Sequence, residues 1–204
     1  MTMHTPLAAT QDESPAGTET TGVSMRTVAQ IAVFAALIGA LGLMGAIAVP
    51  GLVPITAQTL GVMLAGAVLG PWRGSASVAL LLLLVALGMP LLSGGRGGLG
   101  AFVGPSVGYL VGWIVGALVI GLIVHGVRGR PRITWPRVLI GAVTGGIGVI
   151  YLFGIPVQAV VTGLDLWQTA LTSLAFLPGD AVKAAVTVVV TLTLWRAYPR
   201  AFQS

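Results

Sequence analysis

The chain has 204 residues, of which 56% are hydrophobic and only 7% are charged. A soluble domain carries about a quarter charged residues, so this composition excludes an ordinary soluble fold and indicates an integral membrane protein. The net charge of +5 does not indicate nucleic-acid binding, because most of the arginines stand in short connections beside apolar segments. The sequence has no cysteine, which excludes disulfides, thiolate catalysis and cysteine metal sites.

The first 24 residues are polar and differ in composition from the rest of the chain. They include Asp12, Glu13, Glu19 and many threonines, and they bury too little apolar surface to fold. A signal peptide begins with a basic region that is followed by an apolar core, whereas here an acidic tail comes first. We therefore expect a disordered cytoplasmic tail over 1–24, a retained first helix, and one membrane domain over 25–200.

Six apolar segments follow the tail, and runs of about 20 apolar residues are typical of membrane-spanning helices. They cover approximately 27–48, 52–70, 75–92, 105–127, 138–161 and 167–195. The second begins through Pro54, and a tight turn is expected at 70–74. Pro178 and Gly179 interrupt the last segment, so we expect a shorter helical or re-entrant piece before a helix that starts at Asp180. The pattern predicts an all-α membrane protein with six transmembrane helices.

The distribution of arginine predicts how these helices are oriented, because Lys and Arg concentrate in cytoplasmic loops. With the N-terminus inside, every arginine except Arg96 falls on the inner side. The inner arginines are Arg26, Arg73, Arg128, Arg130, Arg132, Arg137, Arg196 and Arg200. Five or seven spans give a much weaker bias. We therefore expect six spans, with the N- and C-termini both cytoplasmic.

Arg96 departs from this pattern and lies in an outer, glycine-rich loop, Ser93–Gly100. Glycine lets the backbone of a loop approach a ligand closely, and a guanidinium attracts an anionic group. The loop therefore predicts recognition of a small molecule, with Gly95, Arg96 and Gly97 at the binding site.

Polar side chains of the spans also gather near their outer ends. They are Thr56, Gln58, Thr59, Ser106, Tyr109, Gln158, Asp180 and Lys183. Asp180 and Lys183 are neighbours on one helical face, and charged groups at membrane depth usually serve a function. The alternative is a structural pair that compensates its own charge. Tyr109 and Trp113, one turn apart, either flank an apolar ligand or pack in the core.

This set suits a ligand with an apolar body, a carboxylate, and a polar head that offers N–H donors and a carbonyl. Arg96, backbone N–H groups of the loop or Lys183 suit the carboxylate. Asp180 or Gln58 suits an N–H donor. The residues alone leave open which group meets which end.

Small residues recur at every fourth position in two spans. They are Gly104, Gly108, Gly112 and Gly116 in the fourth span, and Ala32, Ala36 and Ala40 in the first. Such stripes let helices approach closely in lipid. The glycine stripe predicts packing within the protein, whereas the alanine face either packs internally or docks a partner helix.

The sequence offers little for catalysis. An intramembrane enzyme needs a nucleophile–base pair, paired carboxylates or metal ligands, but the acids after the tail are Asp165 and Asp180, and the histidines are His4 and His125. We therefore expect no catalytic residue, metal site or cofactor in this chain. It also has no Gly-x-x-x-x-Gly-Lys-Ser/Thr motif, so ATP-driven transport requires another subunit. A self-sufficient carrier is an alternative, although no internal repeat is visible.

Three motifs occur in order along the chain: Val53–Met63 (VPITAQTLGVM), Gly94–Gly98 followed by Gly104-Pro105 and Gly108-Tyr109, and Leu177–Asp180 with Lys183. Together they resemble the BioY family, the biotin-binding S components of energy-coupling-factor (ECF) transporters. The resemblance covers about residues 27–195, and the polar N-terminal tail is not part of it.

The resemblance implies a six-helix S-component fold, in a bacterial or archaeal plasma membrane, that captures biotin from outside for uptake. It implies that Ala32 and Ala36 dock a transmembrane coupling subunit, which is driven by two ATPase subunits. Asp180 and Lys183 resemble ligand-site or transport-critical residues of the family, and Arg96 with its glycines resembles part of the outer gate. An S component for another vitamin, such as thiamin or riboflavin, is the alternative.

Overall fold

Helices make up nearly all of the regular structure in the computed structural model, which describes residues 24–47, 55–127 and 133–202. The α-helices are α1 (Met25–Leu43), α2 (Gln58–Leu69), α3 (Pro71–Ala86), α4 (Val107–His125), α5 (Trp135–Val143), α6 (Ile150–Thr162), α7 (Leu166–Ser173) and α8 (Leu177–Ala197). A π-helical turn, η2 (Thr144–Val149), joins α5 to α6. The 3-10 turns are η1 (Leu99–Phe102), η3 (Leu174–Phe176) and η4 (Pro199–Phe202). Two short antiparallel strands, β1 (Ala46–Ile47) and β2 (Ile55–Thr56), pair between α1 and α2.

Four of the described helical segments are long and apolar enough to cross a membrane. They are Met25–Leu43, Val107–His125, Trp135–Thr162 and Leu166–Ala197, and α2 and α3 are shorter apolar helices. The chain is therefore a multi-pass membrane protein. Its six helical segments correspond in order to the six predicted spans, but the second and third are shorter than expected.

The boundaries of α2 and α3 differ from the prediction for local reasons. Residues Ile55–Thr56 are extended in β2, so α2 begins only at Gln58. At its other end Gly70 has a φ of +83°, which ends α2 in one residue, and Pro71 then begins α3. Gly88, with a φ of +103°, follows the end of α3 and turns the chain away before Pro90. The predicted beginning at Pro54 lies outside the described residues.

The last segment contains a short helix, α7, followed by a longer one, α8, as predicted, but the change between them lies at η3, before Pro178. Residues Leu166–Ala197 form one helical stretch, tightened at η3. Pro178 is the second residue of α8, a position where a missing N–H removes no helix bond. The helix therefore begins at Leu177 rather than at Asp180, and no re-entrant piece is seen among the described residues 133–202.

The glycine stripe of α4 packs inside the protein, as predicted, at three of its four positions. A Cβ on Gly108 would overlap the Phe153 carbonyl of α6, and one on Gly116 would lie 2.6 Å from the Gly145 carbonyl of η2. Gly112 also lies close to the backbone of α6. Gly104 precedes α4 and has open space where a Cβ would stand. The close approach sets α4 directly against η2 and α6.

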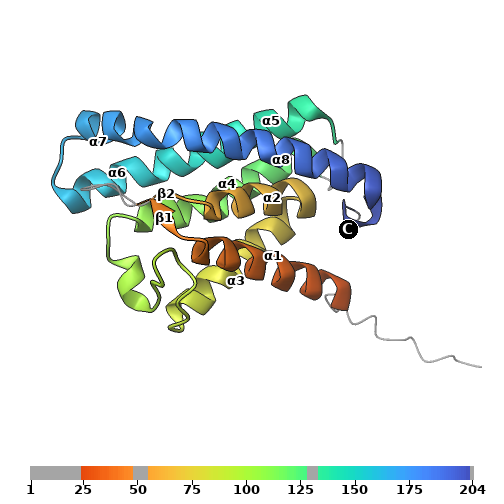
Figure 1. Cartoon of the computed structure of the whole chain (residues 1–204), viewed down its shortest axis with the longest axis horizontal. Helices are drawn as coiled ribbons and strands as arrows, with labels where there is room; N and C mark the ends of the chain where they lie inside the picture. The colour runs from red at the N-terminus through yellow and green to blue at the C-terminus, as the bar shows by residue number, and fades with distance from the viewer. Residues whose placement is uncertain (1–23, 48–54, 128–132, 203–204) are drawn as a thin grey trace, which may run out of the picture.

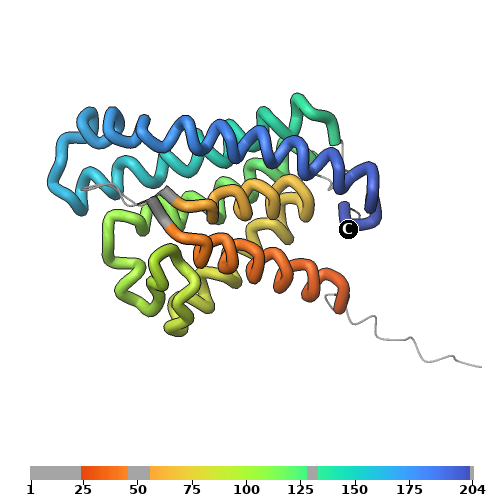
Figure 2. Tube along the Cα trace, viewed as in Figure 1, coloured from red at the N-terminus to blue at the C-terminus, as the bar shows by residue number. Residues whose placement is uncertain are grey.

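The start of α1 and the end of α8 lie at the same end of the molecule (Figures 1 and 2). Side chains join them: Arg26 donates to the carbonyl of Arg200, and Gln30 Nε2 donates to that of Ala201 over 3.3 Å. Arg73 Nη1 donates to Gln30 Oε1 over 2.8 Å. This arrangement suits two termini on one side of the membrane; that this side is cytoplasmic stays a prediction. Of the predicted tail, only Ser24 lies within the described residues.

Candidate functional site

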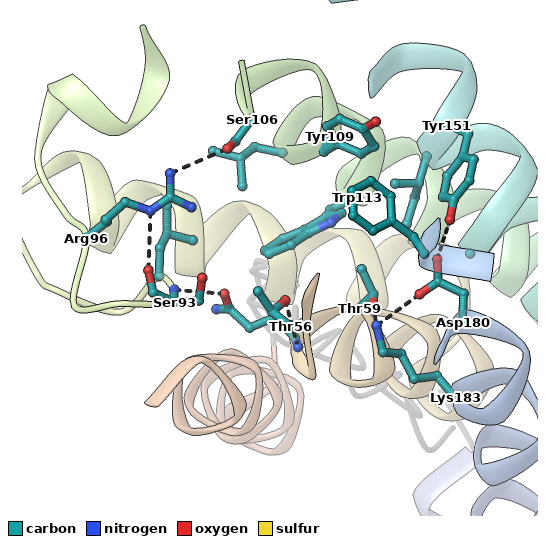
Figure 3. Close-up of a pocket in the computed structure, with 16 residues that line it drawn as sticks. Thr56, Thr59, Ser93, Arg96, Ser106, Tyr109, Trp113, Tyr151, Asp180 and Lys183 are labelled. Carbon is teal, nitrogen blue, oxygen red and sulfur yellow. Dashed lines mark hydrogen bonds and ion pairs between the residues drawn. The ribbon is translucent and has the colours of Figure 1, made fainter. Parts of the chain in front are cut away.

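A pocket opens at the end of the bundle opposite the chain termini and encloses about 620 Å³ of empty space, including its open mouth. Its lining comes from the start of α2, the glycine loop, α4, η2, α6, η3 and α8. Five of the seven residues predicted to bind a ligand line it, namely Gln58, Arg96, Tyr109, Asp180 and Lys183. The polar residues predicted to gather at the outer end are thus largely brought together in one cavity (Figure 3).

One side of the pocket holds a buried ion pair. Lys183 Nζ lies 2.9 Å from Asp180 Oδ1 and donates a second hydrogen bond of 2.8 Å to Thr59 Oγ1. The hydroxyl of Tyr151 donates to Asp180 Oδ2 over 2.7 Å. Asp180 is only 5% exposed. Both carboxylate oxygens are therefore engaged, and side chains from α2, α6 and α8 meet in one network of compensated charge.

The other side of the pocket holds Arg96 on the glycine loop. Two backbone hydrogen bonds, of 3.0 and 3.2 Å, join Arg96 to Leu92 and close a tight hairpin. Gly94 and Gly95 turn this hairpin with φ of +75° and +70°, which side chains disfavour. Arg96 Nε donates to the carbonyl of Ser93 over 3.2 Å, and no carboxylate pairs with Arg96 among the residues described. Within the described part of the chain, the loop thus presents an exposed positive charge without a counter-charge at the pocket.

Aromatic and aliphatic side chains form the wall between the two polar sides. Tyr109 and Trp113 are 7% and 6% exposed and both line the pocket. Leu110, Ile150 and Phe176 complete the apolar lining. In Figure 3 Trp113 lies between Arg96 and the Asp180–Lys183 pair. The pocket therefore separates a cationic side from a charge-neutral polar side by an apolar middle.

Gln58 lines the pocket, but its side chain is already bonded to the backbone. Nε2 donates to the carbonyls of Ile38 and Leu91 over 3.3 and 3.0 Å, and Oε1 accepts from the N–H of Ser93 over 3.2 Å. Its exposed fraction is 1%. Gln58 thus fastens α1 and the base of the glycine loop to α2, and it supports the loop that carries Arg96.

The remaining predicted residues lie outside the pocket lining. Gly95 is at the tip of the hairpin, and Gly97 is packed so that a Cβ would overlap the Met89 carbonyl. Ala32 and Ala36 are exposed on α1, away from its buried residues Ala35 and Ile38. This exposure does not fit internal packing of the alanine face.

The sequence analysis did not single out Tyr151 or Ser93, and it did not anticipate the partner of Thr59. Tyr151 lies in the middle of the fifth span, shortly after η2, and apolar periodicity does not reveal such a π turn. Gln158 was expected with the outer polar group but bonds to Tyr109 behind the pocket wall over 2.8 Å. Within the described ranges no group of three His, Cys, Asp or Glu side chains is placed to hold a metal.

Comparison with known proteins gives consistent results. The sequence model of the BioY family matches residues 13–200. The biotin transporter BioY of Rhizobium etli is 46% identical over 183 residues, covering 87% of this chain and 97% of the relative. Its counterpart in Rhodobacter capsulatus is 47% identical over 185 residues, covering 86% and 96%. The probable biotin transporter BioY of Bacillus subtilis is 45% identical over 168 residues, covering 82% and 89%.

A solved structure has the same fold. The crystal structure of the S-component for biotin from an ECF-type ABC transporter matches with a TM-score of 0.77 and 32% sequence identity. The match covers 84% of this chain and 91% of that one. The likeness therefore extends across the helical bundle that forms the pocket.

Proposed function

Because this chain belongs to the BioY family, we propose that it is the membrane subunit that captures biotin for uptake. The resemblance seen in the three sequence motifs is thereby confirmed, and the chain is a transporter component rather than an enzyme. The observation that carries the proposal is the pocket, in which a cation with no carboxylate partner among the described residues and a neutral polar network are separated by apolar side chains.

Biotin has the complementary layout: a carboxylate at one end, an apolar chain and thioether ring, and a ureido group at the other end. Arg96, which lacks a carboxylate partner in the described part of the chain, suits the ligand carboxylate. The network of Lys183 and Asp180 offers a donor and an acceptor without net charge, which suits the carbonyl and N–H groups of a ureido ring. Tyr109 and Trp113 suit the apolar middle of the ligand.

Uptake is proposed to require partners. The sequence has no recognisable ATP-binding loop, so an ECF coupling subunit and two ATPase subunits would supply ATP hydrolysis. The exposed small residues Ala32 and Ala36 would let a partner helix approach α1 closely. The proposed location is the plasma membrane of a bacterium or archaeon, with the pocket facing outward. No cofactor or metal is proposed for this chain.

Measuring which vitamins the purified protein binds tests the assignment of biotin as its ligand. Isothermal titration in detergent with biotin, thiamin, riboflavin and lipoate should give heat for biotin alone. Tight binding of another vitamin with none of biotin would move the chain to the alternative S-component specificity. Failure to bind any of the four would overturn the proposal.

Uptake into liposomes separates a dependent subunit from a self-sufficient carrier. Radiolabelled biotin should accumulate when this chain is reconstituted with the coupling and ATPase subunits and ATP is enclosed. Accumulation by this chain alone, without ATP, would identify the carrier alternative. Omitting ATP from the full complex is the matched control.

A further inference from the structure

Tyr151 reaches the ion pair from a different helix. It belongs to α6, and its hydroxyl lies 2.7 Å from Asp180 Oδ2 of α8. Lys183 occupies the other carboxylate oxygen, Oδ1, at 2.9 Å. A carboxylate held at both oxygens by donors from two helices has little freedom to rotate. Tyr151 therefore restrains the direction in which Asp180 presents its remaining lone pairs to the pocket.

The π-helical turn η2 provides the backbone that brings Tyr151 to this position. The six residues Thr144–Val149 immediately precede Ile150 and Tyr151, and both of these line the pocket. A π turn contains one residue more than an α turn, and each residue of a helix turns the chain by about 100°. With an α turn in this place, Tyr151 would face away from Asp180.

Close packing holds the π turn in place. A Cβ on Gly145 would lie 2.6 Å from the Gly116 carbonyl of α4, and one on Gly146 would lie 2.6 Å from the Met63 side chain of α2. Glycine at these positions lets η2 lie directly against both helices. The ring of Tyr151 also packs edge-on against that of Tyr109, with centroids 6.3 Å apart. Backbone register and ring packing thus both fix the hydroxyl.

We propose that Tyr151 is a positioning residue, which acts through Asp180 to hold the polar head of the ligand, and that η2 supplies the register for it. This inference rests on the proposed biotin binding. A fixed carboxylate is aligned with the N–H groups of a ureido ring before the ligand arrives, so binding does not have to order it. Without the Tyr151 hydroxyl, Asp180 gains rotational freedom and the ion pair is held less firmly across the pocket.

Tyr151→Phe tests the proposal because it removes only the hydroxyl and keeps the packed ring. Titration should give a biotin Kd roughly two- to tenfold above that of the wild type, because binding must then order the freed Asp180 side chain. The binding stoichiometry should stay unchanged. A purely structural role would instead lower the fraction of protein that binds. Tyr198→Phe, at an exposed tyrosine beyond α8, is the matched control and should bind like the wild type.

A double-mutant cycle with Asp180→Ala tests whether Tyr151 acts through Asp180. The midpoint of thermal unfolding without ligand serves as the readout, so the cycle remains measurable where Asp180→Ala abolishes binding. Tyr151→Phe should lower the midpoint in the wild-type background. In the Asp180→Ala background it should leave the midpoint unchanged or raise it, because the hydroxyl there has no carboxylate partner.

Either of two results would overturn the inference: wild-type affinity in Tyr151→Phe, or an equal drop of the midpoint in both backgrounds. Wild-type protein that fails to bind biotin would instead overturn the proposed function. The two failures are therefore distinguishable.

Discussion

Lys183 of α8 and Thr59 of α2, 124 positions apart in the sequence, are joined by a 2.8 Å hydrogen bond from Nζ to Oγ1. Lys183 also pairs with Asp180 of its own helix, so this bond ties the ion pair of α8 to α2 at the pocket. The sequence analysis left open whether the pair is structural or functional. The bond to Thr59 shows that the pair connects two helices and lines the cavity at the same time.

Breaking the pair on one side should destabilise the protein more than removing both charges. Asp180→Asn leaves the ammonium of Lys183, whose side chain is 15% exposed, without its counter-charge. Loss of one partner of a buried pair costs about 3–5 kcal/mol. The double variant Asp180→Asn/Lys183→Met should recover most of the thermal stability, measured by the unfolding midpoint, while biotin binding stays lost. A double variant with an unfolding midpoint as low as that of Asp180→Asn would contradict this account.

Arg96→Ala should weaken biotin binding through the ligand carboxylate alone. The loss should be about tenfold, as for a charge-assisted hydrogen bond in a partly exposed site. Biotin methyl ester, which lacks the charge, should bind wild type and Arg96→Ala with similar affinity. Titration with both ligands measures the difference. Arg137→Ala, on α5 outside the pocket lining, controls for the general effect of removing a cation. An equal loss for acid and ester would place the carboxylate elsewhere.

Two glycines of the loop should respond differently to alanine. A Cβ on Gly97 would overlap the Met89 carbonyl, so Gly97→Ala must displace the loop that carries Arg96. Gly100 has no heavy atom within 4 Å of its Cβ position and no positive φ, so Gly100→Ala should be tolerated. We expect Gly97→Ala to weaken biotin binding at least severalfold in titrations, and Gly100→Ala to match the wild type. Wild-type affinity for biotin in Gly97→Ala would show that the position of the loop does not affect binding.

The features that could be predicted from the sequence depend on local spacing. The three-residue spacing of Asp180 and Lys183 predicted neighbouring charges, and the four-residue spacing of Tyr109 and Trp113 placed both on one face. Tyr151 could not be found in this way, because its direction depends on a π turn that glycine packing between helices stabilises. The start of α8 was misplaced for a different reason: proline is accepted in the first turn of a helix, so α8 begins at Leu177, before Pro178, rather than at Asp180.

Large side chains on the exposed face of α1 should impair biotin uptake and leave biotin binding unchanged. Ala32 and Ala36 lie on that face, and a tryptophan at either position would prevent close approach of a partner helix. Ala32→Trp and Ala36→Trp should bind biotin like the wild type in titrations but lose most ATP-dependent uptake in liposomes that contain the whole complex. Val189→Trp, on an exposed position of α8, is the control and should transport normally. Normal uptake by both α1 variants would place the coupling surface elsewhere.

Deleting Gly148 should test the register that η2 imposes. Gly148 is exposed, and its Cβ position meets only the Val143 carbonyl at 3.7 Å, so Gly148→Ala should fold and bind biotin normally. Deletion of the same residue would restore α-helical spacing and turn the residues beyond it by about 100°. Tyr151 would then leave Asp180, and α6 would no longer fit the glycine face of α4. We expect the deletion to abolish measurable biotin binding and to lower the unfolding midpoint, whereas wild-type affinity in the deletion variant would show that the π turn does not place Tyr151.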